Sequence, residues 1–189
     1  MIPSEPLSFF RFFDLTALAI FLPAMGWLMW REYRCTQAPF ATISHMVTAS
    51  QKSAVLYGAM MSLIVPMYYG FWYFWLSPWV GAPSWFYGLL AVSFLCELLF
   101  VWFPPSGRWA RLHTATAGTV FVVTFAALLM IIQSGVGGAV SRVLMASGLV
   151  AGVVAVFVVF LRRESWLFSA ELVYCVLFLA AVSGAAHGL

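Results

Sequence analysis

Three ionisable side chains lie within or at the start of long apolar runs, and their types can support chemistry. Glu97 and Glu171 are carboxylates, and His113 is an imidazole at the start of a further apolar run. An ionisable group in hydrocarbon costs about 2.5–3.5 kcal/mol on insertion scales and usually faces the interior of a helix bundle. A carboxylate pair near a histidine can relay protons, bind a metal ion or hold a lipid headgroup.

The composition indicates what kind of structure must position these residues. The chain has 189 residues, of which 64% are hydrophobic and 8% are charged. A soluble domain has roughly 45–50% apolar and about 25% charged residues, and a globule of this size cannot bury so much apolar surface. The composition therefore excludes a soluble enzyme, a disordered chain and a nucleic-acid-binding domain. It predicts an all-α, polytopic membrane protein.

Several apolar segments reach the length of about 20 residues that a membrane-spanning helix needs. They lie at about residues 9–29, 53–76, 84–103, 111–133, 139–161 and 165–187. The connecting loops are short, so we expect a single integral membrane domain, residues 1–189, built as a bundle of six transmembrane helices. The first helix is expected to end at the polar stretch of residues 31–34.

Basic residues divide unequally between the two sides of this predicted bundle. The side of the first, third and fifth loops carries Arg31, Arg34, Lys52, Arg108, Arg111, Arg162 and Arg163. The other side carries only Arg11 and Arg142. Because short loops rich in Lys and Arg stay in the cytoplasm, we expect both termini to be extracytoplasmic.

Orientation and helical rise place the three ionisable residues at similar depth. Glu97 lies about 13 residues, or about 20 Å, into the third helix, which runs inward. Glu171 lies about six residues, or about 9 Å, into the outward-running sixth helix, and His113 begins the fourth. They therefore form one candidate catalytic cluster. In the alternative, Glu171 pairs with Arg162 or Arg163, and desolvation protonates the other carboxylate.

The second helix ends in a cluster of aromatic residues. One interpretation is an aromatic-lined pocket for a lipid or another apolar ligand, with Trp72, Trp75, Trp79 and Trp85 as its binding residues. The other interpretation is an interfacial belt, in which amphipathic rings sit at the level of the lipid headgroups.

Small residues are dense in the fifth predicted helix, where Gly148 and Gly152 form a GxxxG motif. Such residues let two helices approach closely. A bundle of six helices needs close contacts of this kind, so we expect the motif to serve packing within the bundle rather than a dimer interface.

Several known types of site lack the residues that they require. Covalent retinal needs a lysine in the middle of a helix, and the sole lysine, Lys52, begins one. Bis-histidine haem needs paired histidines at one depth, but His113 and His187 are expected at opposite faces. The three cysteines show no CxxC spacing, which argues against a thiolate metal site. No metal site is predicted, and the cofactor is unknown.

Three short segments resemble the DRAM/Frag/Sfk-like group of six-helix membrane proteins. They are Ile43-Ser44, the turn Phe103-Pro104-Pro105 that leads to Leu112-His113, and Ser169-Ala170-Glu171. The resemblance implies a six-helix fold and a role in lipid remodelling, lipid-kinase scaffolding or autophagy, mostly without an established catalytic mechanism. Within it, His113 and Glu171 are the positions of interest. The first loop is shorter here than in that group, and the predicted orientation is the reverse.

These features together predict a non-enzymatic membrane protein that binds lipid or an apolar ligand, alone or as an accessory subunit of a membrane complex. Two alternatives stay open. One is a membrane-embedded enzyme that uses Glu97, His113 and Glu171. The other is a small transporter or its substrate-binding component, which Pro23 and Pro66 permit because such sites often use broken helices. The expected partners are membrane lipid and other membrane subunits, and nucleic acid is not among them.

Overall fold

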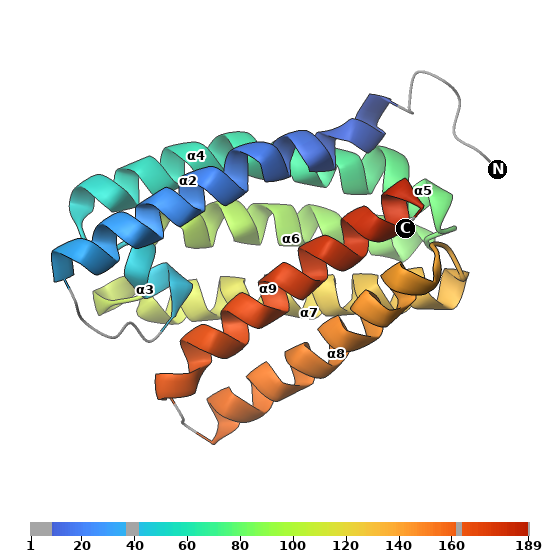
Figure 1. The fold of residues 1–189 in the computed structure, drawn as a ribbon. Coiled ribbons are helices and arrows are strands. Elements are labelled where there is room, and N and C mark those ends of the chain that lie inside the picture. The colour runs from blue at the N-terminus through green and yellow to red at the C-terminus, as the bar shows by residue number, and fades with distance from the viewer. Residues whose placement is uncertain (1–8, 37–41, 162–163, 189) are drawn as a thin grey trace. The chain divides into compact units, whose positions relative to one another are not determined.

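The structure is a computed structural model that describes residues 9–36, 42–161 and 164–188. Its long helices are α2 (Phe13–Thr36), α4 (Gln51–Phe71), α6 (Ser84–Trp102), α7 (Ala110–Ser134), α8 (Ala139–Phe160) and α9 (Glu164–His187) (Figure 1). Short helices lie between or next to them: η1 (Phe9–Phe12), α3 (Ile43–Val47), η2 (Trp72–Leu76), α5 (Ser77–Trp79) and η3 (Gly107–Trp109). The described residues contain helices and turns and no strand.

Six helical stretches are long and apolar enough to cross a membrane. They are Phe9–Cys35, Gln51–Trp79, Ser84–Trp102, Gly107–Ser134, Ala139–Val159 and Trp166–His187. The predicted fold class, an all-α polytopic membrane protein with six transmembrane helices, is therefore confirmed. The second stretch passes through Pro66 and the π-helical turn η2 and ends three residues later than expected.

The prediction that the first helix ends at the polar stretch is wrong, because α2 continues through that stretch to Thr36. Arg31 lies over the ring of Trp27, one helical turn earlier, with its Cζ 5.5 Å from the ring centroid. Glu32, on the same turn, is 2% exposed and accepts hydrogen bonds from the hydroxyls of Ser50 and Ser53. The polar residues thus have partners that suit a helix, so nothing in them forces the helix to end.

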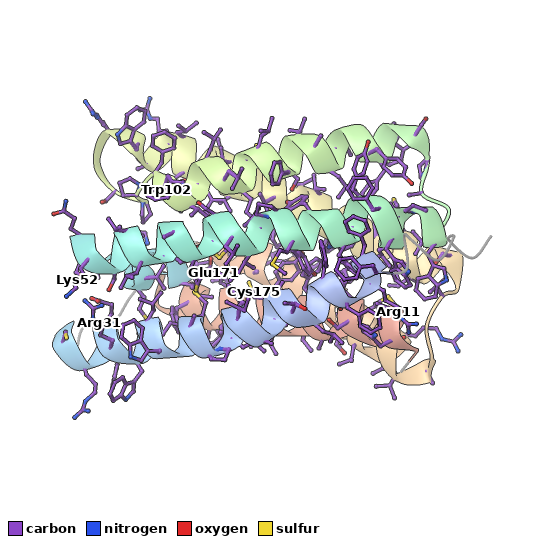
Figure 2. The ribbon with its side chains drawn as sticks, turned by 90° about the horizontal axis from the view of Figure 1, so that it is seen from above. Arg11, Arg31, Lys52, Trp102, Glu171 and Cys175 are labelled. Carbon is purple, nitrogen blue, oxygen red and sulfur yellow. The ribbon has the colours of Figure 1, made fainter. Side chains whose placement is uncertain are left out.

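The chain divides into two compact units. The first comprises Met1–Ala38 and Ser44–Val123, and the second comprises Pro39–Ile43 and Thr124–Leu189. Within the first unit, α4 lies between α2 and α6 (Figure 2). Within the second, α8 packs along α9. The single domain expected from the sequence stays a prediction.

The GxxxG motif of α8 lies at a close helix contact in the second unit. A Cβ added to Gly148 would lie 3.4 Å from Leu128 Cδ1 on α7 and 3.8 Å from Leu177 Cβ on α9. A Cβ added to Gly152 would lie 3.0 Å from Tyr174 Cε2 and 3.2 Å from Phe125 Cδ2. The motif therefore serves packing within the unit, as expected.

Candidate functional site

Glu97 belongs to a polar cluster in the first unit that joins α4 to α6. The hydroxyl of Tyr69, on α4, lies 2.7 Å from Ser93 Oγ and is also a hydrogen-bond partner of Glu97. Ser93 and Glu97 are four residues apart, so they lie on one face of α6. Ser93 is fully buried. This chain of three hydrogen-bonding groups can hold a proton between the helices, and it also satisfies polar groups that hydrocarbon cannot.

His113 lies in the first turn of α7, and its side chain contacts the end of α6 rather than a polar cluster. Its Nδ1 is 3.1 Å from the carbonyl oxygen of Phe100 and 2.8 Å from that of Phe103. Because a carbonyl oxygen only accepts, Nδ1 carries the proton and donates to both. These carbonyls belong to the last turn of α6 and the residue after it, where helical partners are missing. His113 thus fastens the start of α7 to the end of α6.

Glu171 lies in the second unit and is bonded to the first loop of the chain. Its Oε2 accepts a hydrogen bond of 2.8 Å from the backbone N–H of Ile43, at the start of α3. The pairing with Arg162 or Arg163 that the sequence left open falls outside the described residues.

The three candidate catalytic residues therefore have three different sets of partners. Glu97 and His113 belong to the first unit, and Glu171 belongs to the second. Among the described residues, no group of three or more His, Cys, Asp and Glu side chains is arranged to hold a metal ion. A shared catalytic cluster stays a prediction.

The four tryptophans predicted to bind a ligand lie in different surroundings. Trp72 and Trp75, in the π-helical turn η2, are buried. The ring of Trp75 stacks on Phe71 at 5.7 Å and lies 4.7 Å from the ring of Trp79. Trp85, at the start of α6, is 59% exposed. Two of the four rings thus pack in the core, and the proposal that all four line one ligand site stays a prediction.

Arg11, at the other end of the first helical stretch, contacts this aromatic cluster. The guanidinium carbon of Arg11 is 5.6 Å from the ring centroid of Trp75. Its Nε is buried and has no hydrogen-bond partner among the described residues. Asp14 is fully buried at the start of α2. At this end of the first unit, the guanidinium of Arg11 therefore lies against the ring of Trp75.

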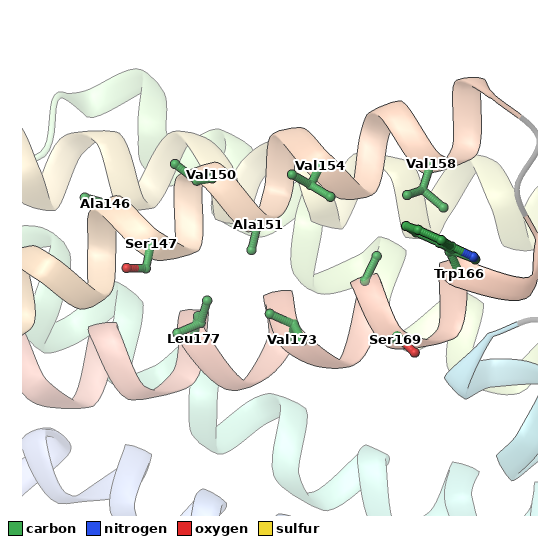
Figure 3. Close-up of a pocket in the computed structure, with 11 residues that line it drawn as sticks. Ala146, Ser147, Val150, Ala151, Val154, Val158, Trp166, Ser169, Val173 and Leu177 are labelled. Carbon is green, nitrogen blue, oxygen red and sulfur yellow. The ribbon is translucent and has the colours of Figure 1, made fainter.

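The structure contains a groove that the sequence did not predict, and it lies in the second unit between α8 and α9 (Figure 3). Its volume is about 820 Å³. Its lining residues are Ala146, Ser147, Val150, Ala151, Val154 and Val158 on α8, and Trp166, Ser169, Ala170, Val173 and Leu177 on α9. The lining is almost wholly apolar, and its outer residues are strongly exposed.

A sequence signal for this groove does exist. Positions 146, 150, 154 and 158 hold Ala or Val and recur every four residues along α8. Such a row forms a continuous ridge of small or branched side chains on one helix face. The signal is weak because the whole helix is rich in the same residues, and nothing in the row is polar.

No protein-family model, curated protein or solved structure matches the chain. Two features of the described residues bear on a candidate functional site. The polar cluster around Tyr69 and Glu97 can hold a proton, and the groove between α8 and α9 can hold an apolar group.

Proposed function

We propose that this membrane protein binds a membrane lipid and holds one acyl chain in the groove between α8 and α9. The observation that carries the proposal is the groove itself, an open apolar channel of about 820 Å³ along two membrane-spanning helices. Most of its lining residues are Val, Ala and Leu, which offer dispersion contacts to a hydrocarbon chain.

The length of the groove suits one leaflet. Trp166 and Leu177, at its two ends on α9, are 11 residues apart, which corresponds to about 16 Å of helix. The hydrocarbon core of a bilayer is about 30 Å thick, so one leaflet contributes about 15 Å. A single acyl chain of that leaflet therefore spans the groove.

The position of Trp166 supports the same occupant. It lies two residues after the start of α9, at the end of a membrane-spanning stretch, and it is strongly exposed. Tryptophan favours the level of the lipid headgroups, where its ring is apolar and its N–H is wet. The groove thus runs from the membrane interface toward the middle of the bilayer, as an acyl chain does.

The test compares two valines of α8 with similar exposure. Val154 lines the groove and is 50% exposed, whereas Val156 does not line it and is 53% exposed. We expect Val154→Trp to fill the groove and to remove the lipid that the purified chain retains in mild detergent. Val156→Trp is expected to retain it. Native mass spectrometry measures the bound lipid directly.

Two results would contradict the proposal. One is a wild-type chain that carries no lipid under these conditions. The other is equal retention by both tryptophan variants, which would place any bound lipid elsewhere. A bound helix in place of the lipid would appear in the same spectra as a second protein mass lost on Val154→Trp.

We further propose that the end of the first unit where α2 ends faces the cytoplasm, with both termini outside. The distribution of basic residues supports this orientation. Cys35 is exposed near the end of α2, whereas Cys96 and Cys175 are partly buried in spanning helices. A thiol reagent that cannot cross membranes should label Cys35 only after the cells are permeabilised. Labelling of intact cells that Cys35→Ser abolishes would reverse the orientation.

Membership of the DRAM/Frag/Sfk-like group remains a proposal with one supporting contact. Two of the three segments that carry the resemblance, Ile43-Ser44 and Ser169-Ala170-Glu171, are joined by the hydrogen bond from Ile43 to Glu171. Segments 128 residues apart thus meet at a specific polar contact. Glu171→Gln keeps the acceptor oxygen and is expected to fold, whereas Glu171→Leu is expected to reduce the yield of folded protein.

A further inference from the structure

A cluster of cations marks one end of the first unit, where α2 ends, α4 begins and α6 leads to α7. We call this cluster the basic rim; its members are Arg31, Arg34, Lys52, Arg108 and Arg111. Figure 2 shows Arg31 and Lys52 at this end together with Trp102, and Arg11 at the opposite end.

Specific contacts bring the helix ends of the rim together. Glu32, near the end of α2, accepts hydrogen bonds from Ser50 and Ser53 at the start of α4. The Nε1 of Trp102, at the end of α6, donates to Ser62 Oγ of α4 at 3.0 Å. His113 ties the start of α7 to the end of α6. These contacts link the helices of the first unit that carry the cations.

The positive charge of the rim is not balanced at its surface. Glu32 is the sole acidic residue in the described segments 27–36, 42–54 and 102–113. It is 2% exposed and bonded to serines, and the Nε of Arg31 lies 3.7 Å from its Oε1. The other four cations of the rim are exposed. The outward face of the rim thus carries a strong net positive charge.

Tryptophans set the depth of this charge. The Cζ atom of Arg34 lies 5.0 Å from the ring centroid of Trp30, one turn earlier on α2, and Arg31 lies over Trp27 in the same way. Both tryptophans are about half exposed. Because α2 runs toward the rim, the Cα of each arginine lies four residues, or about 6 Å, farther along the helix than the Cα of its tryptophan. Rings at the edge of the hydrocarbon thus place the guanidiniums at the level of lipid phosphates.

We infer that the basic rim binds the phosphates of anionic membrane lipids. A guanidinium donates two parallel hydrogen bonds to a phosphate and keeps its charge at every physiological pH. The rim offers these donors beside exposed tryptophans, a combination that fits a lipid headgroup with its acyl chains below. This surface is separate from the groove of the second unit and differs from it in the part of the lipid that it takes.

The test measures lipid preference with the full chain. Phosphatidylglycerol and phosphatidylcholine of identical acyl chains compete for the purified protein in detergent, and native mass spectrometry counts each bound species. The wild-type chain should prefer phosphatidylglycerol. Each cation near an anionic surface contributes about 1 kcal/mol, so Arg31→Gln with Arg34→Gln should lower the preference about 25-fold.

Three controls make the result specific. Arg31→Lys with Arg34→Lys keeps both charges and should retain most of the preference. Arg142→Gln removes an exposed arginine of α8, outside the rim, and should leave it unchanged. Excess inorganic phosphate at constant ionic strength should not abolish it, since the rim takes a headgroup anchored by its chains.

The inference is overturned if the wild-type chain shows no preference, or if the glutamine pair keeps it. It is also overturned if Arg142→Gln lowers the preference as strongly, or if free phosphate displaces the lipid. Val154→Trp, which fills the groove, should leave the preference intact, so failure of the groove proposal and failure of this inference give different results.

Discussion

The two units of the molecule join their helices in different ways. In the first unit, polar side chains bond one helix to the next, as Glu32 does with Ser53 and Tyr69 does with Ser93. In the second unit, the hydroxyls of Thr124 and Tyr174 form one such bond between α7 and α9, while α8 packs on α9 with a close approach at the GxxxG motif. The hydrogen-bonded contacts are directional, whereas the contact between α8 and α9 at the GxxxG motif depends on shape.

The difference follows from how helices associate in lipid. Lipid tails are as apolar as leucine, so helix pairs are stabilised by close packing and by hydrogen bonds rather than by hydrophobic burial. A hydrogen bond sets the register of two helices at one point. The close approach at Gly152 is possible because glycine has no side chain. The neighbouring face of α8, with Val150 and Val154, lines an open groove. The contact between α8 and α9 therefore lies beside a groove with room for a ligand.

The largest effect is expected at the close approach of α8 to its neighbours around Gly152. In Gly152→Leu, the new side chain meets the rings of Tyr174 and Phe125, because even a Cβ there would lie 3.0 Å and 3.2 Å from their carbons. Overpacking against two rigid rings should lower the free energy of unfolding by about 3 kcal/mol. Unfolding in mixed micelles, followed by tryptophan fluorescence, measures this change.

The control is a glycine with open surroundings. Gly118, on α7, has nothing within 4 Å of an added Cβ. Gly118→Leu should therefore leave the free energy of unfolding nearly unchanged. An equal loss in both variants would mean that the effect comes from leucine in a helix and not from the contact between α8 and α9.

A smaller effect is expected at the strongest polar joint of the first unit. Glu32→Ala removes the carboxylate that accepts from Ser50 and Ser53, and hydrogen bonds to charged groups contribute about 2 kcal/mol. The Ser50 hydroxyl still accepts from the N–H of Ser53 at 3.2 Å, so the start of α4 keeps its cap. The same micelle titration measures the change.

Arg31→Gln is the matched comparison for this joint. The Arg31 Nε lies 3.7 Å from the Glu32 carboxylate, and the arginine side chain is 24% exposed. Such partly solvated ion pairs contribute at most about 1 kcal/mol. If Arg31→Gln destabilised the chain as much as Glu32→Ala, the ion pair and not the serines would be the joint.

The sequence predicts the spanning helices well because their signal is the sum of about 20 apolar residues. It predicts the end of α2 poorly because the residues that decide it have partners elsewhere in the chain. Glu32 suits a buried position on a helix because Ser50 and Ser53 donate hydrogen bonds to its carboxylate. A stretch such as residues 31–34 looks like a loop when each residue is judged alone.

The candidate site shows the same limit of sequence-based prediction, both for residues that stand out and for residues that do not. Glu97, His113 and Glu171 stand out in the sequence because charge in hydrocarbon is rare, yet each has its own structural partner. The groove contains nothing rare, and its valines and alanines resemble every other apolar residue of α8. Depth along a helix follows from counting residues, but lateral neighbours depend on helix packing, which short polar motifs do not encode.

The smallest effect is expected for the joint between α4 and α6. Tyr69→Phe removes the hydroxyl that lies 2.7 Å from Ser93 Oγ and bonds to Glu97. Hydrogen bonds between membrane helices contribute about 0.6 kcal/mol on average, because the freed groups find other partners. Ser93 and Glu97 are four residues apart on one helix face, so they can bond to the helix backbone or to each other.

Tyr73→Phe, at a half-exposed tyrosine of η2, should leave the free energy of unfolding unchanged. If Tyr69→Phe instead cost as much as Gly152→Leu, the polar joints would carry the first unit as strongly as shape carries the second, and the contrast between the units would not hold.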